Sequence, residues 1–405
     1  MDYRKLRYLV TGIIGFLSLS VSAKDWTDIT SEVIAAQNMS PGFPGGCSGV
    51  TVNRLTGDVY VKIISYGIWK SSDQGSTWLR IDQKTVGGRC ETGVAMTSDQ
   101  DNPVRLASFS LDGECGFTPD GTTWHKWTDM GRNWDFGSVD WGAANPMVMI
   151  AAKHEDGGKV YKTVDAGLTW NVLPITVNAQ SYNNSSMIGV MDANTFIYCA
   201  SGGIQRSTDQ GASWTQVSTT VARTKIPVLF KAKHYLGAAT GLWVSGDKGA
   251  TWTKQGEPIE ICQGPFFGAD ENTMVIVNTQ GIYKTTNAGA TWTNVAGLPP
   301  SYSGNTFDPL WFGGFSWDPV HNTIYGTRMA CPAYKFVMQG TVITNSFKSP
   351  SQLNSVGVAS RIIRMSDNRI LVNAGANKVY NLEGRRRIIV NSRQSNNRIQ
   401  LPKNP

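Results

Sequence analysis

One short segment of the 405-residue sequence places a histidine and two carboxylates side by side, directly after an apolar run. In AAKHEDGG, which spans residues 151–158, His154 is followed by Glu155 and Asp156. Because the pKa of a free histidine is about 6.5, His154 can act as a general base at neutral pH. The segment therefore predicts a proton-transfer site, and a solvated polar loop is the alternative interpretation.

Arginine and tyrosine residues can supply the two other roles that elimination from a uronic acid needs. Arg89 or Arg328 can bind a carboxylate through two hydrogen bonds and offset its charge. Tyr66, Tyr182 or Tyr334 can give a proton to the leaving oxygen. A base, a charge neutraliser and an acid together favour a polysaccharide lyase that acts on an acidic glycan.

Two carboxylates that face a glycosidic bond would instead support hydrolysis, close together for retention and farther apart for inversion. The pairs that we consider join Glu91 or Asp135 to Glu155. Asp112 and Glu114 occupy similar places in the chain, so residue type alone does not select the pair. Hydrolysis is therefore the alternative to elimination.

The candidate site combines these groups with one aromatic residue. Trp134 is included because an indole can stack on a sugar ring, although it can equally pack between sheets. The candidate catalytic residues are His154, Glu155, Tyr182 and Asp135. The candidate substrate-binding residues are Arg89, Glu91, Arg328, Tyr66 and Trp134.

Metal chemistry has little support in the sequence. None of the six cysteines forms a CxxC pair, and no Cys/His spacing is typical of zinc. We therefore expect no metal in the site and no cofactor, with a structural calcium ion left open. Disulfides from Cys47 to Cys90, or from Cys90 to Cys115, would suit an oxidising compartment, whereas Cys199 lies in an apolar run and is expected to be a buried thiol.

A repeat predicts the elements that position these residues. The segment SSDQGSTW, which ends at Trp78, is repeated as TVDAGLTW, STDQGASW, SGDKGATW and TTNAGATW. A shorter, degenerate copy, TPDGTTW, ends at Trp124. We call each copy a box. Successive box Asp or Asn residues are 47, 45, 44, 38 and 40 residues apart, which is typical of the four-stranded blades of a β-propeller.

The residue types of the box are those of a tight turn. The Asp or Asn side chain can accept backbone N–H groups two residues further on, and the box glycine can adopt the positive φ that such a turn needs. A Ser or Thr hydroxyl adds a local hydrogen bond, and the tryptophan can fill the wedge between neighbouring blades. The boxes therefore predict the fold and not the function.

These boxes resemble the Asp-box (BNR) repeat of sialidases, xyloglucanases and related secreted propellers. The resemblance implies that the boxes are structural turns on the face away from the active site. It also implies a ligand site at the opposite end of the channel, where loops between second and third strands meet the connections between blades. The candidate residues named above lie in those loops and connections.

Two departures from the resemblance limit what it implies about activity. Sialidases carry a Phe/Tyr-Arg-Ile-Pro motif early in the chain, whereas the nearest segment here is mid-chain TKIP at residues 224–227, which lacks the Arg. Asp-box xyloglucanases place a catalytic Asp in the loop of the first blade, whereas that loop here, residues 64–67, holds no carboxylate. Neither activity transfers directly from the resemblance.

Alternating apolar residues and turn glycines outline the blades. Seven central hairpins are expected, and the first strand, WTDIT at residues 26–30, resembles the run after a box and should close the ring as an outer strand. Residues 361–390 form either an eighth blade without a box or an appended hairpin. The expected fold is an all-β propeller of four-stranded blades, with seven blades favoured and eight left open.

The ends of the chain differ from its body. Residues 1–23 have the basic start, apolar run and small-residue end of a bacterial export signal. Residues 24–337 are the expected propeller, with a net charge of −4, and residues 338–405 are a basic C-terminal segment with eleven Lys and Arg against two carboxylates. We expect a secreted or periplasmic protein with no membrane span.

The combined prediction is a carbohydrate-active propeller whose partner is a polysaccharide or oligosaccharide. A nucleic-acid partner is not expected, because the propeller body is acidic and no nucleic-acid-binding motif occurs. A lyase on an acidic glycan is the first choice, and a glycoside hydrolase with a carboxylate pair is the alternative. A non-catalytic glycan- or protein-binding propeller is the third, because this fold hosts all three functions.

Overall fold

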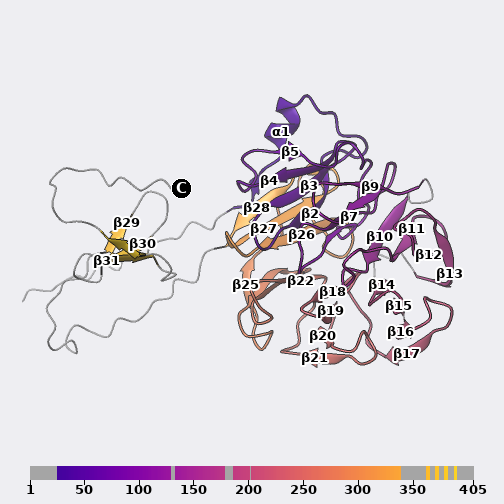
Figure 1. The fold of residues 1–405 in the computed structure, drawn as a ribbon. Coiled ribbons are helices and arrows are strands. Elements are labelled where there is room, and N and C mark those ends of the chain that lie inside the picture. Colours follow the sequence, from indigo (N-terminus) through magenta and orange to yellow (C-terminus); the bar gives the residue numbers. More distant parts are fainter. Residues whose placement is uncertain are drawn as a thin grey trace, which may run out of the picture. The chain divides into compact units, whose positions relative to one another are not determined.

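A computed structural model describes residues 25–128, 133–177, 186–200 and 202–338, and the backbone of four strands between residues 362 and 389. The expected export signal and Tyr182 lie outside the described residues. The chain divides into two compact units, residues 1–340 and 341–405 (Figure 1), and each is described by itself.

The first unit is a propeller of seven four-stranded antiparallel sheets arranged in a ring (Figure 1). Its first three complete blades are β2 (Cys47–Val52), β3 (Val59–Ile63), β4 (Gly67–Ser71), β5 (Leu79–Arg80); β6 (Met96–Ser98), β7 (Leu106–Ser108), β8 (Gly116–Thr118), β9 (His125–Lys126); and β10 (Trp134–Val139), β11 (Met149–Lys153), β12 (Lys159–Thr163), β13 (Asn171–Thr176). The next three are β14 (Met187–Val190), β15 (Phe196–Ala200), β16 (Gly203–Ser207), β17 (Thr215–Ser218); β18 (Val228–Phe230), β19 (Lys233–Ala238), β20 (Gly241–Ser245), β21 (Thr253–Gln255); and β22 (Gln263–Phe267), β23 (Met274–Asn278), β24 (Gly281–Thr285), β25 (Thr293–Ala296).

The seventh blade joins the two ends of the propeller. It contains β26 (Gly313–Asp318), β27 (Thr323–Arg328) and β28 (Tyr334–Val337), and its outer strand is β1 (Thr27–Asp28) from the start of the chain. Thr27 pairs with Lys335 and Asp28 pairs with Tyr334. The prediction that WTDIT at residues 26–30 closes the ring is confirmed, as are the seven blades. A short helix, α1 (Ser31–Ala36), follows β1 and buries none of its residues.

The boxes form the turns between the third and fourth strands of their blades. In the first blade, Ser71 Oγ donates to Asp73 Oδ1 at 2.8 Å and accepts the N–H of Gly75 at 2.8 Å. Asp73 accepts both the N–H and the hydroxyl of Thr77, at 2.8 and 2.7 Å. Gly75 has the expected positive φ of 92°. The carboxylate therefore bridges to the residue four positions on, and the expectation of two positions was wrong for the full boxes.

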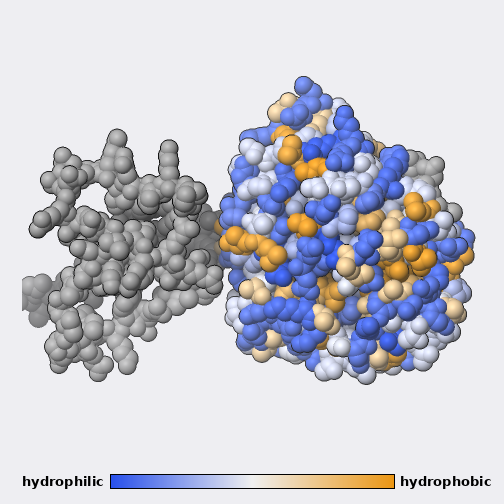
Figure 2. All heavy atoms as spheres, viewed as in Figure 1, coloured by the Kyte–Doolittle hydropathy of each residue, from blue (hydrophilic) through white to orange (hydrophobic). Residues whose placement is uncertain are grey.

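Because consecutive strands of a blade are antiparallel, alternate loops lie at the same end of the propeller. The turns between first and second strands lie at the same end as the boxes, while the turns between second and third strands lie at the other end with the connections between blades. We call these two ends the box face and the opposite face. On the face seen in Figure 2, hydrophilic residues predominate and hydrophobic residues form small separate groups.

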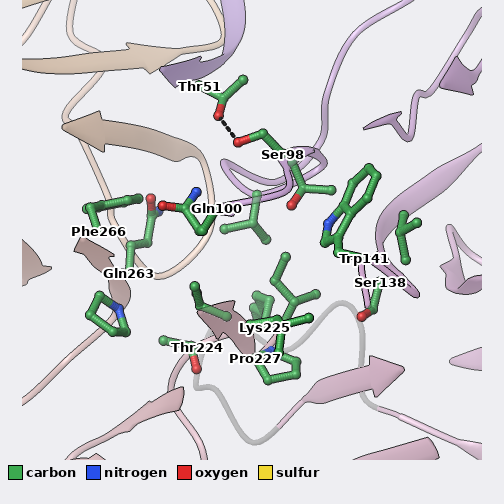
Figure 3. Close-up of a pocket in the computed structure, with 18 of the residues that line it drawn as sticks. Thr51, Ser98, Gln100, Ser138, Trp141, Thr224, Lys225, Pro227, Gln263 and Phe266 are labelled. Carbon is green, nitrogen blue, oxygen red and sulfur yellow. Dashed lines mark hydrogen bonds between the residues drawn. The ribbon is translucent and has the colours of Figure 1, made fainter. Parts of the chain in front are cut away.

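A cavity of about 80 Å³ lies on the axis, lined by the first strand of every blade (Figure 3). Thr51 and Ser98 share a hydrogen bond of 2.7 Å at its wall, and Trp141 and Lys225 point toward it from other blades. His234 also lines it, is only 4% exposed, and has no hydrogen-bond partner for either ring nitrogen among the described residues. Burial lowers the pKa of His234 to about 4.

All six cysteines are buried free thiols. The expected disulfides from Cys47 to Cys90 and from Cys90 to Cys115 are therefore absent, while the expectation for Cys199 is confirmed. Cys47 donates to Thr30 Oγ1 at 3.4 Å, and burial raises the pKa of its thiol to about 12. Since the thiolate is the reactive form, this burial protects Cys47 from exchange.

The second unit contains one four-stranded antiparallel sheet. Its strands, β29 (Ile362–Arg364), β30 (Ile370–Asn373), β31 (Lys378–Asn381) and β32 (Arg387–Ile389), pair in chain order with one another. The segment at residues 361–390 is therefore more than a single hairpin, and the ring of seven blades is complete without it. Within the described residues, no helix has the length and apolar character needed to cross a bilayer.

We predict that Asp73→Ala lowers the free energy of unfolding by about 1–2 kcal/mol, because two donors on Thr77 lose a charged acceptor. Asp73→Asn should cost less, since Asn287 occupies the same place in its own box and accepts the N–H of Thr291 at 3.0 Å. Chemical denaturation of the three proteins measures the difference. Equal losses in both variants would contradict this account of the box.

We also predict that His234 makes the protein sensitive to acid. Between pH about 6.5 and about 4 the unfolded chain binds a proton at His234 that the folded chain does not, so stability falls as the pH falls. The loss is on the order of 3 kcal/mol. His234→Gln should flatten the dependence of unfolding free energy on pH, and His125→Gln, at an exposed position, should leave it unchanged. A slope that is equal in all three proteins would contradict the prediction.

Candidate functional site

A bulge at the start of the third blade creates the central feature of the candidate site. Trp134 pairs with Lys153 and Phe136 pairs with Ala152, so Asp135 is an extra residue in β10. A bulge redirects a side chain that regular alternation would place elsewhere. Here the side chain of Asp135 is fully buried. Its Oδ1 lies 2.6 Å from Nδ1 of His154, a predicted catalytic residue in the turn between β11 and β12.

The turn between β11 and β12 presents His154 at the opposite face. Its backbone N–H donates to the carbonyl of Asn133 at 2.8 Å, and its side chain is 21% exposed. Glu155 Oε1 lies 3.7 Å from Nε2 of His154, and the Glu155 side chain is 74% exposed. Nδ1 is therefore held by Asp135, while Nε2 is the ring nitrogen left for proton transfer near the surface.

The pair of Asp135 and His154 has the electrostatics of an acid–base group. Burial raises the pKa of Asp135 to about 6, with the hydrogen bond to His154 opposing that rise and the nearby charge of Glu91 adding to it. Asp135 Oδ2 has no hydrogen-bond partner among the described residues. An ionised Asp135 would orient the imidazole and stabilise its protonated form, as a carboxylate does in hydrolytic triads.

An ion-pair cluster lies beside this pair. Arg89 Nε is 3.6 Å from Glu91 Oε2, and Arg89 Nη1 contacts Asp112. The N–H of Asp112 donates to the side chain of Asn133 at 3.3 Å, and the carbonyl of Asn133 accepts from His154. This chain of contacts joins the cluster to the pair of Asp135 and His154. The structure thus gathers five predicted site residues at the opposite face, between the second and third blades: Arg89, Glu91, Asp135, His154 and Glu155.

Trp134 does not have the accessibility predicted for it. Its side chain is fully buried, with its ring centroid 4.9 Å from that of Trp170 and 5.6 Å from that of Tyr161. Trp134 also belongs to a core cluster that contains Phe109 and Trp127 of the second blade, so the alternative interpretation, packing between blades, is the right one. No face of this indole is open to a sugar.

Tyr66 and Arg328 make their described contacts in other blades. The hydroxyl oxygen of Tyr66 accepts the N–H of Ser40 at 3.0 Å. Arg328 ends β27, where its guanidinium lies 5.3 Å from the ring of Phe312 and donates to the carbonyl of Met329 at 3.4 Å. These contacts hold loops of the first and seventh blades.

Two residues near the site were missed by sequence reasoning. Phe43 is 84% exposed, and its ring centroid lies 5.8 Å from the guanidinium carbon of Arg89. Lys225, in the TKIP segment, is buried with its ammonium 4.8 Å from the ring of Trp311, and burial lowers its pKa to about 8 while the charge of Asp135 opposes the shift. The only sequence signal for Phe43 was an aromatic residue in the glycine- and proline-rich segment PGFPGG.

The axial cavity and the cluster are separate features. None of the predicted site residues that the structure describes lines the cavity, whereas Lys225 lines it and also lies within electrostatic reach of Asp135. Among the described residues, no group of three or more His, Cys, Asp or Glu side chains is arranged to hold a metal ion. The acid–base cluster, which gathers the predicted proton-transfer groups, is the feature on which a function can be built.

No protein-family model matches the chain. A xyloglucanase from Paenibacillus sp. is 26% identical over 247 residues, which cover 56% of this chain and 23% of that protein. A xyloglucanase from Hypocrea jecorina is 32% identical over 155 residues, which cover 36% of this chain and 17% of that protein. The chain therefore spans about a quarter or less of the length of these curated relatives.

Matches to solved structures have low identity and low TM-scores. The GH74 xyloglucanase from Xanthomonas campestris is 18% identical with a TM-score of 0.39, and the match covers 78% of this chain and 46% of that one. The sequence matches make part of the chain similar to part of two xyloglucanases.

Proposed function

We propose that this protein is an exported glycoside hydrolase that acts on a polysaccharide at the opposite face, between the second and third blades. The observation that carries the proposal is the 2.6 Å contact between buried Asp135 and half-buried His154, next to the ion pair of Arg89 and Glu91. Export rests on the signal predicted at residues 1–23.

In this mechanism His154 is the proton donor. The carboxylate of Asp135 stabilises the imidazolium, which gives its Nε2 proton to the glycosidic oxygen as the bond to the sugar breaks. Glu91 accepts a proton from the water that attacks the sugar carbon, and Arg89 holds that carboxylate in place. The water thus supplies a hydroxyl to one fragment, and the other fragment leaves with the proton from His154.

The curated relatives support hydrolysis over elimination, because both are named as xyloglucanases. Xyloglucan is therefore the first substrate to test. The lyase favoured by the sequence has no support from these relatives. One observation keeps it as a second candidate: contacts through Asp112 and Asn133 link a histidine base to Arg89, which could bind the carboxylate of a uronic acid.

The test is a panel of xyloglucan, other neutral glucans and polygalacturonate, incubated with the protein and assayed for both reducing ends and ultraviolet absorbance. We expect reducing ends without absorbance, because hydrolysis adds water and leaves no double bond. Absorbance from an unsaturated uronic product would favour the lyase instead. No product from any polysaccharide would contradict both and favour a binding propeller.

We predict that His154→Ala lowers kcat by about 10²–10⁴-fold, the range for loss of a general acid–base group. Asp135→Asn should also lower kcat while changing KM little, because it removes the charge that stabilises the imidazolium. His125→Ala is the matched control, since this exposed histidine lies in β9, an outer strand away from the cluster. A variant of His154 with the kcat of the parent protein would contradict the mechanism.

A further inference from the structure

An exposed aromatic ring lies next to the acid–base cluster. Phe43 is 84% exposed, the most exposed of the large apolar side chains among the described residues. Its ring centroid is 5.8 Å from the guanidinium carbon of Arg89, which in turn contacts Glu91 and Asp112. An isolated exposed apolar residue needs no explanation, but this one lies beside the groups proposed to cleave a sugar chain.

The loop that carries Phe43 is fixed at both of its ends. Before Phe43, the N–H of Ser40 donates to the hydroxyl oxygen of Tyr66 in the first blade at 3.0 Å. After it, the carbonyl of Gly45 accepts the N–H of Ala330 in the seventh blade at 2.8 Å. Within the loop, the N–H of Gly45 donates to the carbonyl of Gly42 at 2.6 Å. The ring is therefore presented from a loop tied to two blades.

The chemistry around the ring fits a sugar. A pyranose has an apolar face of C–H groups and a rim of hydroxyls, so it is bound well by an apolar platform flanked by charged hydrogen-bonding groups. Phe43 offers the platform, and Arg89, Glu91 and Asp112 offer donors and acceptors beside it. The guanidinium of Arg89 also limits where the aromatic ring can move, through a cation–π contact.

We propose that Phe43 is a binding platform on which one pyranose ring of the polysaccharide stacks, adjacent to the site of cleavage. This inference rests on the proposed function, because it takes the acid–base cluster as the place where the chain is cut. Phe43 binds substrate and takes no part in proton transfer. Its removal therefore weakens binding of ground state and transition state alike, which raises KM and leaves kcat unchanged.

The experiment separates binding from cleavage. Binding of xyloglucan and of polygalacturonate is measured by affinity electrophoresis in the His154→Ala background, where the polymer should stay intact. In this background, Phe43→Ala should weaken binding of the preferred polymer about 3–10-fold, the range expected for one aromatic stacking contact. Phe43→Trp should retain or improve binding. Leu79→Ala, at a 69% exposed position in outer strand β5, is the matched control and should bind like its parent.

Kinetics in the His154-containing protein complete the test. We expect Phe43→Ala to raise KM by the same factor and to keep kcat within about twofold of the parent value. Equal affinity of Phe43→Ala and its parent for a polymer that the protein cleaves would overturn the platform and leave the hydrolase standing. Binding that depends on Phe43 without cleavage of any polymer would overturn the hydrolase and leave the platform standing. Because Phe43 is exposed, unchanged melting temperatures should confirm that the variants fold.

Discussion

The pairing of β1 with β28 is the contact on which the ring depends. It joins residues about 300 positions apart in the chain, and it covers the edge that β28 would otherwise present. Thr30, directly after β1, strengthens the join, because its hydroxyl oxygen accepts both the N–H of Ala333 at 2.9 Å and the thiol of Cys47. Without β1, the seventh blade would lack its outer strand.

Closure also shapes the candidate site. The N–H of Cys47 donates to the carbonyl of Cys331 at 2.9 Å, next to the contact between Gly45 and Ala330. The loop that presents Phe43 is therefore held by the same junction of first and last blades that completes the ring. Arg89, which faces Phe43, follows the first full blade, so the platform and the acid–base cluster are brought together by the ring and not by nearness in sequence.

The propeller could be predicted from the sequence because each box repeats a turn that is held by hydrogen bonds made within the box. Ser71, Asp73, Gly75 and Thr77 satisfy one another within seven residues, so the turn can be recognised without its surroundings. Ring closure could be predicted for the same reason, since WTDIT at residues 26–30 resembles the strand that follows a box. Local patterns of this kind are visible in a single sequence.

The site depended on contacts that no local pattern contains. The bulge at Asp135 is set by how β10 pairs with β11, and it decides that this carboxylate meets His154. The burial of Trp134 depends on packing against Trp170 in the same region of the core. Phe43 was missed because the whole first blade separates it in sequence from its neighbour Arg89. The predicted loop positions identified candidate site residues, but only the folded propeller shows which of these residues are in contact.

Asp73 and Asp135 illustrate a difference between the two faces of the propeller: the first stabilises a turn, and the second belongs to the proposed acid–base pair. At the box face, the hydroxyl and N–H of Thr77 lower the pKa of Asp73, so its charge is stable and serves only the turn. At the opposite face, burial raises the pKa of Asp135, and a single hydrogen bond from His154 offsets part of that cost. A proton moves easily only where the charged and neutral forms are close in free energy. Asp135 comes nearer to that condition than Asp73 does, because hydrogen-bond donors in the box stabilise the charged form of Asp73.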